Sequence, residues 1–258
     1  MSKRLGVVYA YGVYGLGQWF PTFFVSWPPW PIFELKFPPM KKLPLTLTIG
    51  ISETKLKEHP TTNVNLTGFN FLHSPSKTNA GGVGLYINEG LRYDMMPDVK
   101  FETEGVEYIF VRVHVQKALT VAVIYKHPGT KQETFLDEFS NILETLTAAN
   151  EQIFIMGDIN IDLLKTTNFN TRYREMLDSY GIAQIITEPT RITDQSKTLL
   201  DHFYCNTHQY HLSPFVLQHS MTDHYPIICH MKLALPHCAK EFESRTPLNP
   251  RGIEEYIE

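Results

Sequence analysis

The pattern of apolar and polar residues along the chain predicts a mixed α/β fold. Residues 132–148 and 171–180 place their apolar side chains at helical spacing, and Gly181 follows the second segment where glycine commonly ends a helix. Short runs rich in Val, Ile and aromatic residues predict strands. These strands are expected at residues 45–52, 82–87, 107–115, 119–125, 153–156, 182–186, 199–205, 214–217 and 227–233. Because strands outnumber helices, we expect packed β-sheets with helices outside them.

The predicted elements divide the chain into three parts. Residues 1–44 form an atypical, apolar and Pro-rich leader, residues 45–235 form one domain, and residues 236–258 form a polar linker. No residue from 5 to 33 is charged, which is typical of a membrane span, but glycines and prolines interrupt the run. Lys3 and Arg4 precede an apolar stretch as in a signal peptide, although no small-x-small cleavage site follows. We expect an irregular leader, with membrane or secretory targeting as the less favoured alternative.

Composition narrows the class of protein. The chain has 258 residues, of which 43% are hydrophobic and 19% charged, so it can bury a sizeable core and is neither a coiled coil nor disordered. A net charge of −4 argues against a basic surface coat for nucleic acid or membrane but leaves a local basic groove possible. The three cysteines, without a CxxC, exclude a disulfide scaffold and fit a reducing compartment. We therefore expect an intracellular protein, nuclear or cytoplasmic, with no stable membrane partner.

Acidic residues stand at the ends of several predicted core strands. Glu53 closes one strand, Asp158 and Asn160 follow another directly, Asp201 lies within an apolar strand, and residues 223–224 (Asp-His) precede the last one. Taken singly, each has a simpler explanation as a cap, a turn or a loop ion pair. Buried carboxylates are costly unless a cation or hydrogen-bond donors offset them. As an ordered set they indicate convergence on a hard metal such as Mg²⁺, which prefers oxygen ligands.

These residues belong to a series of short motifs in a characteristic order. The series resembles the endonuclease/exonuclease/phosphatase superfamily and, more narrowly, the apurinic-type endonuclease domain of non-LTR (LINE-like) retrotransposons. The motifs are ISET (51–54), GGV (81–83), IYK (124–126), MGDIN (156–160), EPTR (188–191), LDH (200–202) and TDH (222–224). The EPTR segment followed by the LDH segment favours the retrotransposon branch over secreted DNases or lipid phosphatases.

The resemblance implies a fold and a function. The fold is a four-layer α/β sandwich with two packed β-sheets, and the domain nicks DNA ahead of a reverse-transcriptase domain, which this chain would lack. The family's first strand carries an Asn near the metal site, followed by a helix. No Asn precedes Asn63 here, so we expect this first strand and helix to be missing or replaced. The alternatives are a catalytically inactive remnant of the domain, or a superfamily phosphoesterase that acts on a lipid or nucleotide.

The resemblance also assigns roles on the metal side of the site. Glu53 would hold Mg²⁺ (or Mn²⁺), and Asp223 would be a second carboxylate near the metal. Asp158 would orient or deprotonate the attacking water, and Asn160 would position that water or donate to phosphate.

The remaining roles concern charge and phosphate. His224 would stabilise the developing charge on phosphorus, Asp201 would orient His224, and Tyr125 would donate its phenol to a phosphate oxygen. Contacts to the DNA backbone are expected from Lys126, Arg191 and Lys197, unless these are ordinary solvated side chains. A zinc site at His202, Cys205, His208 and His211 is disfavoured, because a spacing of three alternates faces on a strand.

Overall fold

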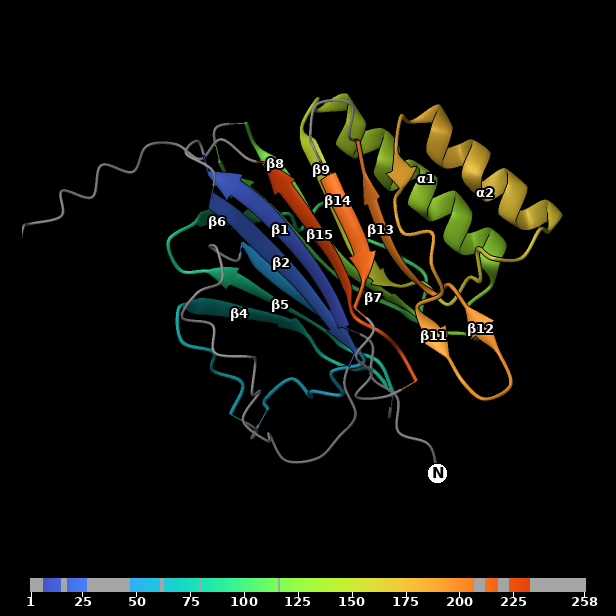
Figure 1. Cartoon of the computed structure of the whole chain (residues 1–258), viewed down its shortest axis with the longest axis horizontal. Helices are drawn as coiled ribbons and strands as arrows, with labels where there is room; N and C mark the ends of the chain where they lie inside the picture. Colours follow the sequence, from blue (N-terminus) through green and yellow to red (C-terminus); the bar gives the residue numbers. More distant parts are fainter. Residues whose placement is uncertain are drawn as a thin grey trace, which may run out of the picture.

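The strands of this computed structural model assemble into two large β-sheets and one small hairpin (Figure 1). The structure describes residues 7–14, 18–26, 47–60, 63–78, 80–115, 117–206, 212–217 and 223–232. The seven-stranded sheet has the order β14-β15-β1-β2-β3-β5-β4. Its strands are β1 (Val7–Tyr14), β2 (Gln18–Ser26), β3 (Thr48–Ser52), β4 (Phe69–Ser74), β5 (Val83–Asn88), β14 (Leu212–Val216) and β15 (Ile227–Lys232).

The six-stranded sheet has the order β10-β13-β9-β8-β7-β6. In this sheet β8 and β9 are parallel, and the other neighbours are antiparallel. Its strands are β6 (Arg92–Met95), β7 (Val106–His114), β8 (Leu119–Lys126), β9 (Gln152–Asp158), β10 (Ala183–Gln184) and β13 (Asp201–Cys205). The small hairpin joins β11 (Arg191–Ile192) to β12 (Lys197–Thr198).

Helix α1 (Gln132–Ala148) connects the parallel strands β8 and β9. Its bounds and its buried face are those that the apolar spacing predicts, because Phe135, Leu136, Phe139, Ile142, Leu143 and Leu146 are all buried. Helix α2 (Asn168–Ser179) begins three residues before the predicted start. There the Thr167 hydroxyl accepts a hydrogen bond from the backbone N–H of Asn170 and so caps the first turn.

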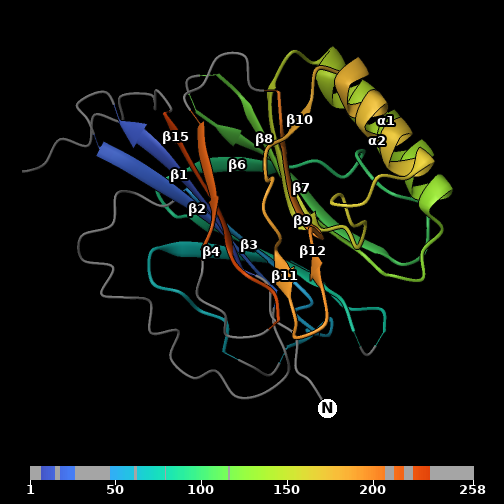
Figure 2. The same ribbon diagram turned by 45° about the vertical axis from the view of Figure 1, so that its right-hand side comes forward.

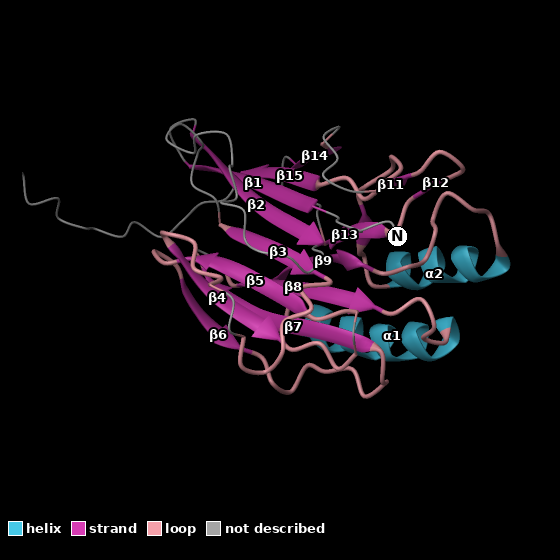
Figure 3. Cartoon of the chain, turned by 90° about the horizontal axis from the view of Figure 1, so that it is seen from below, coloured by secondary structure: helices cyan, strands magenta, loops and turns pink. Residues whose placement is uncertain are grey.

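The two helices lie side by side on the outer face of the six-stranded sheet, and the other sheet packs on its inner face (Figure 2). Every residue of β8 is therefore buried, which explains its nearly continuous apolar sequence. Strands β3 and β5 pack against β7, β8 and β9 across the interface between the sheets. Viewed from below, both helices lie on one side of the stacked strands (Figure 3). These layers confirm the α/β sandwich.

The leader prediction needs a correction. Residues 7–14 and 18–26 are not irregular but form β1 and β2, which insert between β15 and β3. Both segments are rich in aromatic and β-branched residues, which favour strands, and the scattered glycines and prolines hide this signal in the sequence. Within the described part of the chain, no helix is both long and apolar enough to cross a membrane. The proposed domain boundary at residue 45 and the linker at 236–258 stay predictions.

Five further strands differ from prediction. The sequence pattern missed β4, β6, β11 and β12, which are edge or hairpin strands, and most of their residues are at least partly exposed. The expected strand at 182–186 is reduced to the two residues of β10. The central strands β8 and β9 of the six-stranded sheet were predicted, because burial on both faces leaves a clear apolar signal.

Candidate active site

Four polar residues form one row across the six-stranded sheet. In the strand register Glu107 of β7 lies beside Tyr125 of β8, and Tyr125 lies beside Asp158 of β9. Asp158 in turn lies beside Asp201 of β13. Registered neighbours point to the same face of a sheet, and each of the four is at most 2% exposed. The fold therefore gathers three carboxylates and a phenol on one buried face.

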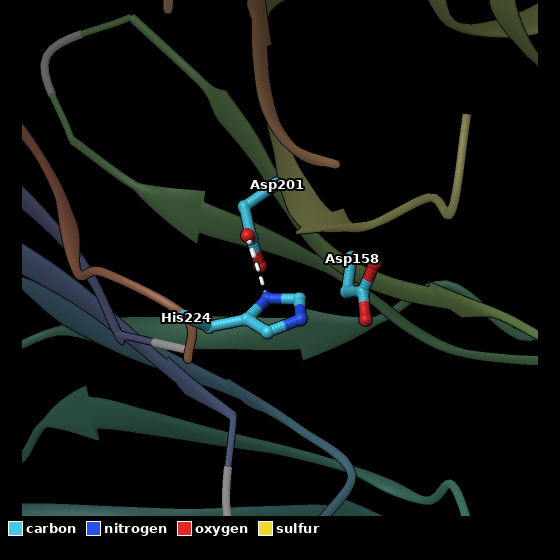
Figure 4. Close-up of side chains that lie close together, drawn as sticks. All are labelled: Asp158, Asp201 and His224. Carbon is cyan, nitrogen blue, oxygen red and sulfur yellow. Dashed lines mark hydrogen bonds and ion pairs between the residues drawn. The ribbon is translucent and has the colours of Figure 1, made fainter. Parts of the chain in front are cut away.

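His224 completes one end of this row. Its Nδ1 lies 2.9 Å from Oδ2 of Asp201, and both side chains are buried. Figure 4 shows the ring between the two aspartates, with its other nitrogen on the side of Asp158. Asp158, Asp201 and His224 each offer a ligand atom, and these atoms all lie within 4.8 Å of one another.

The segment Thr190–Ile192 holds His224 at this position. The backbone N–H of Ile192 donates to the carbonyl of Asp223 (2.8 Å), and that of Tyr225 donates to the carbonyl of Thr190 (2.6 Å). The buried hydroxyl of Thr190 accepts from the backbone N–H of Asp201 at 3.0 Å. One residue thus connects both members of the Asp201–His224 pair.

Asp158 is placed by the close approach of β9 to β8. A Cβ atom on Gly157 would lie 1.7 Å from the carbonyl oxygen of Ile124, so only glycine fits before Asp158. After the strand, Asn160 adopts a left-handed conformation (φ 52°), which asparagine tolerates. Its backbone N–H donates to Oδ1 of Asp158 (3.1 Å), and its side-chain amide donates to the carbonyl of Lys126 (2.8 Å).

Glu53 approaches the row from the opposite sheet. It follows β3, and its Oε1 accepts a 2.9 Å hydrogen bond from the hydroxyl of Tyr125. Glu53 and Lys55 both have left-handed backbone conformations, with φ of 53° and 55°. Such residues cost about 1–3 kcal/mol each and persist only where the surroundings fix them. Here Thr54 and Lys55 donate their backbone N–H groups to the carbonyls of residues 82 and 81.

Burial and mutual charge shift the pKa values of this cluster. Burial and the charge of Asp201 raise the pKa of Asp158 above its usual range. Burial lowers the pKa of His224, but the charge and hydrogen bond of Asp201, with the charge of Asp158, outweigh it and raise the pKa overall. Burial and the nearby charge of Glu53 also raise the pKa of Tyr125, so its phenol stays protonated. The site therefore combines Asp158 as a proton acceptor, His224 as a cationic hydrogen-bond donor and Tyr125 as a neutral donor.

Solved structures share this architecture. A family protein from Bacteroides thetaiotaomicron, named for the endonuclease/exonuclease/phosphatase family, has 10% identity and a TM-score of 0.52, covering 72% of this chain and 81% of its own. The endonuclease domain of TRAS1, a telomere-specific non-LTR retrotransposon, has 13% identity and a TM-score of 0.58, covering 73% and 86%. The chain has the endonuclease/exonuclease/phosphatase fold. The APE2 catalytic domain from Xenopus laevis shows the same fold at 15% identity and a TM-score of 0.54, covering 75% and 86%.

The comparisons by sequence give a different result. No protein-family model matches the chain, and no curated protein sequence does. The fold expected from the motifs, that of the endonuclease/exonuclease/phosphatase superfamily, is confirmed by the solved structures.

Three residues expected to contact DNA phosphates have different surroundings. Lys126 is fully buried, its ammonium donates to the carbonyl of His127 (3.2 Å), and burial lowers its pKa. Arg191 donates from Nε to Oδ2 of Asp223 at 2.8 Å. Lys197 is exposed on the hairpin. Of the three, only Lys197 is exposed, as a residue that contacts a phosphate should be. The alternative that Lys126 is an ordinary solvated side chain is wrong.

Asp223 is expected near the metal, and this stays a prediction; in the structure its Oδ2 pairs with Arg191, and its charge also raises the pKa of His224. His202 lies beneath the helices, where its Nε2 contacts the carbonyl of Ile161 (3.0 Å) and its Nδ1 the hydroxyl of Tyr204 (2.5 Å). Cys205 is three positions further along β13 and so faces the other side of the sheet. Among the described residues, His202 and Cys205 thus form no common zinc site; His208 and His211 lie outside them.

The sequence pattern did not identify two residues of the site, Glu107 and Thr190. Glu107 is an acid within an apolar strand, which is the signal that identified Asp201. Its place beside Tyr125 depends on the register of β7 and β8, which the sequence does not reveal. Thr190 belongs to a quoted motif, but its bond to Asp201 joins residues 11 positions apart and is a tertiary contact.

The donor set fits a divalent cation. Asp158, Asp201 and Glu53 supply carboxylate oxygens, and all three residues are buried. Oδ1 of Asp201 is buried without a hydrogen-bond partner in the described part of the chain. A buried oxygen that lacks a donor is where a hard cation such as Mg²⁺ lowers the cost of burying charge.

Proposed function

We propose that the chain is a metal-dependent DNA endonuclease that makes nicks by hydrolysing phosphodiester bonds, as in non-LTR retrotransposons. The observation that carries the proposal is the buried cluster of Asp158, Asp201 and His224 beside Glu53, on a fold shared with solved endonuclease structures. Mg²⁺, with Mn²⁺ as the alternative, would be held on the Glu53 side; when bound it polarises the phosphate and neutralises charge on the leaving oxygen.

Asp158 is the group best suited to accept a proton from water. Its raised pKa brings its proton affinity closer to neutral pH, where a general base works best. The backbone N–H of Asn160 donates to Oδ1 of Asp158, and one N–H of its side-chain amide donates to the carbonyl of Lys126. Within the described part of the chain the amide oxygen and second amide N–H of Asn160 have no other partner, so they can hold the water or a phosphate oxygen.

His224 is suited to stabilise negative charge on phosphate. Asp201 holds its Nδ1, so the ring is fixed and its other nitrogen lies toward Asp158 (Figure 4). Its raised pKa favours the imidazolium, which donates a charge-assisted hydrogen bond. Tyr125 now donates to Glu53, and a phosphate oxygen would compete with Glu53 for that hydroxyl.

DNA is the proposed substrate, with Lys197 on the exposed hairpin as the best-placed phosphate contact. A downstream reverse-transcriptase domain and a nuclear or cytoplasmic location follow from the retrotransposon resemblance and belong to the same proposal.

A plasmid-nicking assay with a titration of Mg²⁺ tests the proposal. We expect supercoiled plasmid to become open circles only with added divalent metal. Asp158→Ala and His224→Ala should each lower the rate by at least about 100-fold, the scale of a lost general acid or base. Asp137→Ala, which removes an exposed acid on α1, is the matched control and should leave the rate unchanged. Nicking that survives Asp158→Ala contradicts the proposal.

One observation favours the inactive alternative. Strands β1 and β2 contain no Asn, whereas the family resemblance expects one in the first strand. Absence of nicking at every Mg²⁺ concentration would support an inactive domain. Hydrolysis of a phosphoinositide or nucleotide substrate, but not of plasmid, would support the other superfamily activity.

A further inference from the structure

A second carboxylate–histidine pair lies at the other end of the polar row. His127 follows β8, and its Nε2 is 3.1 Å from both carboxylate oxygens of Glu107. The Glu107 side chain is 1% exposed and that of His127 is 17% exposed. The row therefore ends in Asp201–His224 on one side and in Glu107–His127 on the other, and the proposed chemistry uses only the first pair.

The His127 ring supports Tyr125 directly. The edge of one ring meets the face of the other at a centroid distance of 4.8 Å and an interplanar angle of 73°. Tyr125 in turn donates its hydroxyl to Glu53. Because Glu107 fixes the imidazole, it also limits where the phenol and its hydrogen bond to Glu53 can lie.

The same pair packs against the loop that holds Glu53. A Cβ atom on Gly81 would lie 2.9 Å from Oε1 of Glu107 and 2.9 Å from Nε2 of His127, so the backbone there is in close contact with both. The carbonyl of Gly81 accepts the backbone N–H of Lys55 at 2.8 Å. That bond helps to fix the left-handed turn at Glu53 and Lys55.

The backbone of His127 is itself anchored. Its N–H donates to the carbonyl of Gly105 at 2.8 Å, and the hydroxyl of Thr130 donates to the same carbonyl at 3.0 Å. His127 is thus held both through its backbone, by Gly105, and through its ring, by Glu107. Its contacts reach Glu53 by two routes, through the phenol of Tyr125 and through the backbone of Gly81.

We propose that Glu107 and His127 are positioning residues that set the orientation of the Glu53 carboxylate for metal binding. The inference rests on the proposed function, because it concerns the metal-binding side of the same site. It assigns neither residue a contact with the metal or the substrate. Partners that orient a ligand typically change metal affinity 10- to 100-fold, and this is the effect expected here.

The test measures Mn²⁺ binding to the full chain by electron paramagnetic resonance, without DNA. Glu107→Leu and His127→Leu should each weaken binding at least about tenfold. Glu107→Gln should stay within about threefold, because the amide oxygen accepts the same hydrogen bond. The control is His114→Leu, which breaks the exposed His114–Asp94 pair (2.6 Å) elsewhere in the same sheet and should leave binding unchanged.

The outcomes distinguish a positioning role of Glu107 and His127 from an effect on folding and from an effect of the Glu107 charge. A purely structural role would lower the melting temperature and leave Mn²⁺ affinity unchanged, which would overturn the inference. Equal weakening by Glu107→Gln and Glu107→Leu would overturn it too, since charge would then be the cause. If Glu107→Leu does not fold, His127→Leu decides, because that ring is partly exposed. A wild-type chain that neither binds Mn²⁺ nor nicks DNA overturns the proposed function as well; unchanged variants of an active wild type overturn this inference alone.

Discussion

The hydroxyl of Thr190 connects the start of β13 to the segment that holds His224. Thr190→Val keeps the shape of the side chain and removes only this hydroxyl. The hydroxyl accepts backbone N–H groups from Leu200 at 3.1 Å and from Asp201 at 3.0 Å, and Thr190 is fully buried. Both donors would lose their hydrogen-bond partner.

The size of the effect follows from these two bonds. A buried donor left without a partner costs about 1–3 kcal/mol. The N–H of Asp201 is buried and that of Leu200 is partly buried, so the first loses nearly the full amount and the second less. We expect Thr190→Val to lower the free energy of unfolding by about 2–4 kcal/mol.

Urea unfolding followed by circular dichroism measures this loss. The matched control is Thr198→Val in the same hairpin, because the Thr198 hydroxyl is buried without a hydrogen-bond partner among the described residues. That change should cost less than about 0.5 kcal/mol or stabilise the protein. If both variants lose the same free energy, the assigned hydrogen bonds do not determine stability here and the reasoning fails.

Three further predictions concern buried groups. Gly157→Ala should destabilise the fold by more than about 3 kcal/mol, because its Cβ meets the Ile124 carbonyl; a thermal melt close to wild type would contradict this. Burial lowers the pKa of His202 to about 4, so the unfolded chain binds its proton first as the pH falls below 6.5, and stability is lost toward pH 4. The stability advantage of wild type over His202→Gln should therefore shrink by about 2 kcal/mol between pH 7 and 5, in urea titrations; no pH dependence would refute the assignment. Lys126→Met should leave affinity for duplex DNA within about twofold and raise the free energy of unfolding by up to about 2 kcal/mol; a clear loss of affinity in fluorescence anisotropy would restore its phosphate role.

Local patterns determined the helices and the central strands of the six-stranded sheet. The apolar face of α1 repeats at helical spacing within 17 residues, so its bounds follow from the sequence. The strands β8 and β9 lie between the helices and the other sheet, and their continuous apolar runs report that burial. By contrast, β6 at the sheet edge is mostly exposed and has no such signal.

The site shows the same division. Residue types and their order identified Glu53, Asp158, Asp201 and His224, because acids at the ends of apolar strands are unusual without a role. They could not show that Asp223 pairs with Arg191. That pairing depends on the packing of the hairpin against the last loop, which involves residues 32 positions apart.

The sequence by itself determined that this is an α/β chain with carboxylates placed at the ends of core strands. Only the tertiary structure decided that Glu107, Tyr125, Asp158 and Asp201 stand in one row, and that β1 and β2 complete the sheet beside Glu53's strand. The physical reason is that periodicity and burial are encoded locally, in each residue's preference for water or core. Register and contact across sheets depend on the sum of many weak packing and hydrogen-bond energies between distant segments.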